Sequence, residues 1–200
     1  PTDVFNVVRV IMKAFTKFLL LCAMLLIAFL PQYSQAGTDE KNDALLKNVS
    51  RSLLNSPDES LRKLDELVLQ QATFSTEQKN KFLLLRASAL GFLGKHRERV
   101  QFVQSVISDI SDIDYRARFL YQLSDGYINL GEYENALSYM NQSIVMLPGL
   151  KNKNAKIDVL QSAITILNSL RAYDESMEYA LRLPELDRDE ITSSATCLGI

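Results

Sequence analysis

The sequence is poor in the residue types that most often carry out chemistry. It contains one histidine, His96, and two cysteines, Cys22 and Cys197. A zinc site draws several nitrogen and sulfur ligands together, and these three residues cannot supply such a set. Glycine-rich phosphate loops and nucleophile-elbow motifs are also missing. We therefore expect no catalytic residue, no metal and no cofactor in this segment, although a catalytic domain could follow residue 200.

Long apolar runs are missing too, except near the start, where residues 18–30 are all apolar. Lys13 and Lys17 precede this run and Ser34-Gln35-Ala36 follow it, a pattern typical of a secretory signal peptide. The run is short for a transmembrane helix, which needs about 20 residues. We assign residues 12–36 to a signal peptide cleaved after Ala36, with an uncleaved anchor as the alternative. Residues 1–11 are then sequence upstream of the true initiator or a cloning remnant.

Removal of this leader changes the charge and the cysteine content of the chain. Beyond residue 36 there are 19 basic and 23 acidic residues, a balance that argues against nucleic-acid binding. Only Cys197 remains, so no intrachain disulfide can form even in an oxidising compartment. We expect an exported protein, in the periplasm of a Gram-negative bacterium. It would meet a membrane only through the leader, an uncleaved anchor or a span after residue 200.

The mature part, residues 37–200, shows no sustained alternation of apolar and polar residues. Apolar residues instead recur at steps of three and four, which predicts helices. The predicted hairpins cover about 42–74, 80–113, 117–150 and 156–184, and another helix starts within 186–200. Their turns are expected at Asn55-Ser56-Pro57, Gly94, Gly131 and Arg171-Ala172. Glycine allows the tight backbone turn, and Ser56 and Pro57 are expected to supply a helix cap and a first-turn proline.

One of these hairpins, from Ala117 to Leu150, resembles a tetratricopeptide repeat. The family signature is W-x2-L-G-x2-Y, then A-x3-F, then P, over 34 residues. The matching residues are Leu123, Tyr127, Ala136 and Pro148, while Leu120, Ser124 and Met140 are replacements of small or apolar character. The neighbouring copies are more degenerate, and the preceding one has Arg99 where the small alanine belongs. His96 occupies the place of Tyr133, so we expect it to pack between helices.

The resemblance covers nearly all of the mature chain and implies an all-α solenoid of helix-turn-helix repeats. Such repeats form a right-handed superhelix whose first helices line a concave groove that holds a peptide or a partner protein. The positions that face the groove in this family correspond here to Lys81, Leu84, Ser88, Arg118, Tyr121, Asp125, Ile128 and Asn129. The alternative for these residues is an ordinary solvated face.

A leader followed by loose repeats also resembles the periplasmic input region of membrane-bound bacterial signalling proteins, notably diguanylate cyclases with a GGDEF domain. The sequence therefore predicts a non-catalytic protein-interaction module that forms the front part of a longer protein. Two alternatives stay open. One is a sensory input domain that binds a small ligand or peptide, and the other is an assembly factor for an envelope complex or secretion apparatus.

Overall fold

A computed structural model of the chain describes residues 37–184 and shows them to be helical throughout, with no strand in that range. The predicted leader 12–36, the upstream segment 1–11 and the helix expected within 186–200 lie outside the described residues. The elements in chain order are a helix at 37–52, α2 (Pro57–Leu67), η1 (Val68–Thr73), α3 (Thr76–Phe92), α4 (His96–Val106), η2 (Ile107–Asp109), α5 (Ile113–Asn129), α6 (Tyr133–Met146), η3 (Leu147–Gly149), α7 (Lys153–Ser169) and a helix at 173–184.

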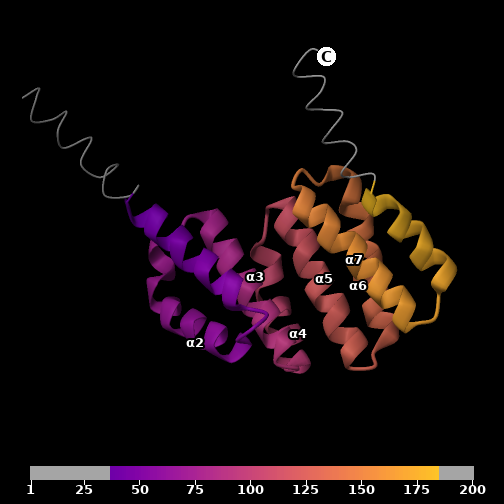
Figure 1. The fold of residues 1–200 in the computed structure, drawn as a ribbon, viewed down its shortest axis with the longest axis horizontal. Helices are drawn as coiled ribbons and strands as arrows, with labels where there is room; N and C mark the ends of the chain where they lie inside the picture. The colour runs from indigo at the N-terminus through magenta and orange to yellow at the C-terminus, as the bar shows by residue number, and fades with distance from the viewer. Residues whose placement is uncertain (1–36, 185–200) are drawn as a thin grey trace, which may run out of the picture.

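Each helix packs against its neighbours in the chain. Helix α3 contacts α2, α4 and α5, and α5 in turn contacts α4, α6 and α7. Figure 1 shows the helices following one another along the long axis of the molecule, from helix 37–52 at one end to helix 173–184 at the other. The first helix of each pair therefore lies beside the first helix of the next pair, α3 beside α5 and α5 beside α7.

Three of the turns share one helix-ending geometry. Gly94, Gly131 and Arg171 all have positive φ, at 69°, 77° and 62°. In each turn the next residue donates its N–H to a carbonyl in the last turn of the preceding helix, and these bonds, Lys95 to Leu90, Glu132 to Tyr127 and Ala172 to Leu167, all measure 2.9 Å. This is the Schellman arrangement, which satisfies carbonyls at a helix end. The turns fall where the sequence predicted them.

Polar caps set where several helices begin, and the helices begin before the predicted hairpins. The Ser75 hydroxyl accepts from the Gln78 N–H at the start of α3, and the Asp112 carboxylate accepts from the Tyr115 N–H at the start of α5. Asn152 caps α7 in the same way. These residues extend the helices toward the N-terminus because they satisfy orphan N–H groups. Pro57 opens α2 as expected, but the Ser56 side chain makes no cap hydrogen bond, so that part of the prediction was wrong.

Small side chains lie where helices cross, and they allow the backbones to approach. Ala87, Ala136 and Ala163 have no exposed surface, and Ser124 is equally buried. The Ser124 hydroxyl donates to the Ala136 carbonyl at 2.6 Å, so α5 and α6 are joined at a point where both residues are small. Phe82, Phe119 and Leu123 fill the core between α3 and α5.

Candidate functional site

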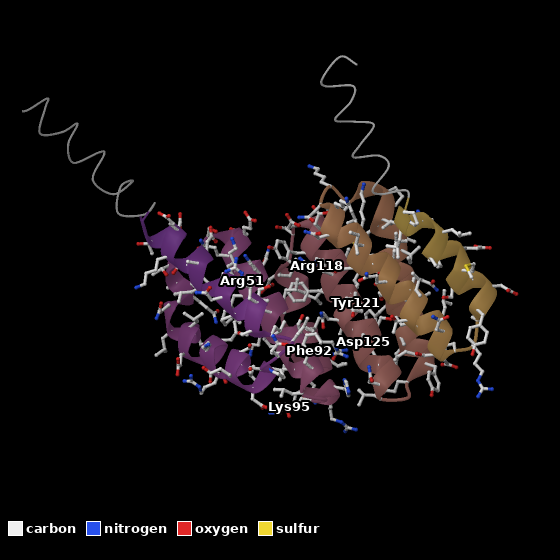
Figure 2. All side chains as sticks on the ribbon, viewed as in Figure 1. Arg51, Phe92, Lys95, Arg118, Tyr121 and Asp125 are labelled. Carbon is white, nitrogen blue, oxygen red and sulfur yellow. The ribbon has the colours of Figure 1, made fainter. Side chains whose placement is uncertain are left out.

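A cavity of about 690 Å³ opens along one face of the molecule, and the first helices of the pairs form its walls. Helix 37–52 and α3 supply one side, α5 and α7 supply the other, and two residues of α4 reach it from between α3 and α5. We call this cavity the groove. Figure 2 shows Arg118, Tyr121 and Asp125 in that order along α5, with Phe92 of α3 beside them in this view. Its volume lies within the range of ordinary ligand pockets, about 300–1,000 Å³.

Six of the eight residues expected to face the groove line this cavity: Leu84, Ser88, Arg118, Tyr121, Asp125 and Asn129. Ile128 does not, because it packs against the core cluster formed by α6 and α7. Helix geometry explains the difference, since a residue ten positions after Arg118 is rotated by roughly 80° from it, whereas one eleven positions on returns to the same face. Lys81 is half-buried and is not among the lining residues. Partner binding by any of these side chains stays a prediction.

Arg99 is one of several lining residues that sequence reasoning did not place in the groove. The side chain extends from α4 between two helical glycines, Gly91 of α3 and Gly126 of α5. A methyl group on Gly91 would collide with Nη1 of Arg99, and one on Gly126 would lie 2.6 Å from Cγ2 of Val100 and 3.5 Å from Nε of Arg99. Helical glycine is less stable than alanine by about 1 kcal/mol. Arg99 stands where the repeat signature has a small alanine, and two helical glycines, Gly91 and Gly126, provide the space for its side chain. This combination is the signal in the sequence that could have revealed the site.

The Arg99 guanidinium is the centre of a buried polar network. Its Nη1 lies 2.6 Å from Oδ2 of Asp125 and donates to Oε1 of Gln122 at 3.4 Å. Its Nη2 lies 3.4 Å from Nδ1 of His96, and Gln122 donates onward to the Ser88 hydroxyl at 3.1 Å. The buried Nε of Arg99 has no hydrogen-bond partner within the described residues. The network thus joins α3, α4 and α5 at the floor of the groove.

The two partners of this ion pair differ in what they present to the groove. The Arg99 side chain is 4% exposed, whereas that of Asp125 is 21% exposed. A ligand in the groove therefore meets the carboxylate of Asp125, with the guanidinium behind it. Because removing a buried charge's partner is costly, the contact with Arg99 holds the Asp125 side chain in place.

A second ion pair lies further along the same wall. Nε of Arg118 donates to Oδ2 of Asp158 at 2.5 Å, which links α5 to α7. Both side chains are about 30% exposed, so the guanidinium and the carboxylate are equally accessible. Arginine has further N–H donors on its two Nη nitrogens. The wall formed by α5 and α7 therefore offers strong donors and strong acceptors.

Two titratable groups in the groove are shifted toward their neutral forms. Burial, with the nearby Asp125 carboxylate, raises the pKa of the Tyr121 hydroxyl to about 12, so it stays protonated at physiological pH. Partial burial lowers the pKa of His96, and the positive charge of Arg99 acts in the same direction, partly opposed by Asp125. The expectation that His96 only packs between helices was incomplete, because its ring also lines the groove.

The opposite wall carries the large apolar residues of the groove, together with Ser50 and Ser88. Leu53 and Leu84 line it and are buried, while Leu54 is 74% exposed and Phe92 is 52% exposed. Large apolar side chains left in contact with water inside a cavity favour burial against a ligand, at about 25 cal/mol per Å² covered. The groove therefore combines an apolar side with a side that carries two ion pairs.

Two other kinds of feature, a metal-ion cluster and a membrane-spanning helix, are not found in residues 37–184. No three His, Cys, Asp or Glu side chains of this range are grouped so that they could hold a metal ion. None of its helices has both the length and the apolar character needed to cross a membrane. Comparison with protein-family models and with curated proteins gave no match. Fold and groove together define an all-helical protein with a two-sided cavity along its first helices.

Proposed function

We propose that residues 37–184 form a tetratricopeptide-like solenoid and that its groove binds a peptide or an extended segment of a partner protein. The observation that carries this proposal is the composition of the groove, in which exposed Leu54 and Phe92 face a wall with two ion pairs. Exposed apolar anchors rimmed by polar groups are typical of protein-interaction sites.

Three features of the fold support the solenoid. Helices α3, α5 and α7 contact one another in sequence, as repeats that stack only on their neighbours do. Of the four residues that match the family signature, Leu123 and Ala136 are buried, Tyr127 is half-buried and Pro148 is exposed; the replacement Met140 is buried. The three Schellman turns recur at the corresponding positions. Stacked hairpins of this kind generate extended concave binding surfaces.

A peptide selection with matched variants tests the proposal. Random peptides displayed on phage would be selected against the native chain, and synthetic copies of the enriched peptides would be titrated by calorimetry. We expect the Arg118→Glu/Tyr121→Ala variant to lose binding by tenfold or more. The control is Arg116→Glu/Tyr133→Ala, since Arg116 lies on the same helix but does not line the groove. Equal loss in both variants, or no enrichment at all, would reject the groove as the binding site.

A sensory input function is the second candidate, and the size of the cavity favours it. A volume of about 690 Å³ suits a small ligand as well as a peptide side chain. We propose for both candidates that the chain acts after export, as the leader predicts, and without catalysis of its own. The reading frame beyond Ile200 separates them. A transmembrane span followed by a GGDEF domain supports sensing, and further repeats followed by a stop codon support a scaffold or an assembly factor.

A further inference from the structure

The positions of the charged groups in the groove narrow the class of ligand. Arg118 and Asp125 are seven residues apart on α5, so they lie on the same face and are separated by about 10 Å along the axis. Tyr121 lies between them, and all three line the groove. The wall thus presents a guanidinium, a neutral hydroxyl and a carboxylate in a row.

Burial decides which charge is presented at the Asp125 end, and the atoms used in the ion pair decide what Arg118 can still offer at the other end. At the Asp125 end, the carboxylate is five times more exposed than the Arg99 guanidinium behind it, at 21% against 4%. A ligand group that contacts this end must therefore be a donor, and a cation makes the strongest such bond. At the other end, Arg118 and Asp158 are equally exposed, and their contact uses Nε of Arg118, so a ligand carboxylate would bind the Nη donors next to the Asp158 carboxylate. A carboxylate is the group that matches the Nη donors of a guanidinium in a planar, bidentate way.

The distance between Arg118 and Asp125 along α5 corresponds to a certain length of extended peptide. An extended chain advances about 3.3 Å per residue, so about 10 Å corresponds to three residues. Phe92 and Leu54 lie on the opposite wall, where they can cover a bulky apolar side chain in the middle of such a segment. The cavity volume of about 690 Å³ is sufficient for a segment of this size.

We propose that the groove recognises about three residues of extended peptide that carry a carboxylate at one end, a cationic group at the other and a large apolar side chain between them. Arg118 would bind the carboxylate and Asp125 the cation, with Arg99 as a positioning residue that holds Asp125. This inference rests on the proposed peptide-binding function. The two charges can come from the termini of a free tripeptide, or from Glu and Lys side chains within a longer segment.

Calorimetric titration of the native chain with defined peptide pools tests the assignment. The first pool contains tripeptides with a central phenylalanine and free termini, and matched pools are acetylated, amidated or both. The second contains end-blocked nine-residue peptides with Glu-Phe-Lys or Lys-Phe-Glu at the centre, and its control pool has Gln in place of both charged residues. We expect removal of either charge to weaken binding by tenfold or more, and whichever pool binds identifies the source of the charges.

Protein variants assign each charge to its residue. The Arg118→Gln variant should bind peptides with and without the carboxylate equally well. The Asp125→Asn variant should bind peptides with and without the cation equally well. The peptides with removed charges are titrated into the native chain, so this part of the test does not depend on whether Asp125→Asn folds normally. Equal affinity for charged and uncharged pools would overturn this inference but leave the peptide groove intact. If no defined pool binds but peptides enriched by phage selection bind the groove, this inference is also overturned. If neither the defined pools nor the phage-selected peptides bind, the proposed function itself is rejected.

Discussion

Removal of Asp125 should destabilise the protein far more than removal of a comparable surface carboxylate. The Asp125→Ala substitution leaves the Arg99 guanidinium without its counter-charge, although this side chain is only 4% exposed and its Nε has no hydrogen-bond partner among residues 37–184. Breaking a buried ion pair in this way costs about 3–5 kcal/mol. For a chain of this size, each kcal/mol corresponds to about 2–4 °C in Tm. We therefore expect Tm to fall by roughly 10 °C.

The chain provides its own control for this experiment. Arg86 and Asp65 form an ion pair with the same separation of 2.6 Å, but Asp65 is 53% exposed. Asp65→Ala should cost only about 0–1 kcal/mol, because solvent screens the pair. Urea unfolding followed by far-UV circular dichroism measures both free energies of unfolding. The comparison isolates burial, because the two pairs share residue types and distance.

A double variant completes the test. Arg99→Met together with Asp125→Ala removes both charges and places an apolar side chain in the space between Gly91 and Gly126. Replacement of a buried pair by apolar residues is often neutral or stabilising, so the double variant should be more stable than Asp125→Ala by at least about 2 kcal/mol. If Asp125→Ala costs no more than Asp65→Ala, or if the double variant is the least stable of the set, the buried pair does not have the energetic role described here.

Three further predictions concern the turns, the histidine and the leader. Arg171 has φ of 62° where Gly131 stands in the equivalent turn, so Arg171→Gly should raise the free energy of unfolding by about 1 kcal/mol, and Gly131→Ala should lower it by a similar amount in urea titrations. His96 has a lowered pKa, so its NMR titration, the only histidine signal of the chain, should have its midpoint below 6.5. The unfolded state then binds this proton first, and stability should fall as the pH drops below about 6.5, a slope that His96→Asn should remove. Mass spectrometry of protein from the periplasmic fraction should give a mature chain that begins at Gly37, and an intact leader would contradict the predicted cleavage.

The helical hairpins could be predicted because their signals are local. Apolar residues at steps of three and four specify helices, and Gly94 and Gly131 mark positions where the chain needs positive φ. Arg171 carries no such signal, and its turn was predicted only because apolar periodicity is interrupted there. The starts of α3, α5 and α7 were placed too late, because one polar cap residue can extend a helix beyond its first apolar position.

The residues that face the groove were predictable on α3 and α5, but the contacts between helices were not. Arg118, Tyr121 and Asp125 were placed there by the resemblance to the repeat family, and their spacing on α5 is consistent with one shared face. The ion pair of Arg99 with Asp125 joins residues from different helices, and its position depends on the close approach that two glycines permit. The apolar wall at Leu54 was missed because the residue lies in the turn after helix 37–52, outside the helical repeat.

The position of Arg99 has a mechanical consequence. This side chain is rooted in α4 and occupies the seam where α3, α4 and α5 meet. A substitution that displaces Asp125 would leave the buried charge of Arg99 in that seam with one partner fewer. The contact that closes the floor of the groove is therefore also a contact between helices, so a change at Asp125 affects the packing of α3 and α4 as well as the groove itself.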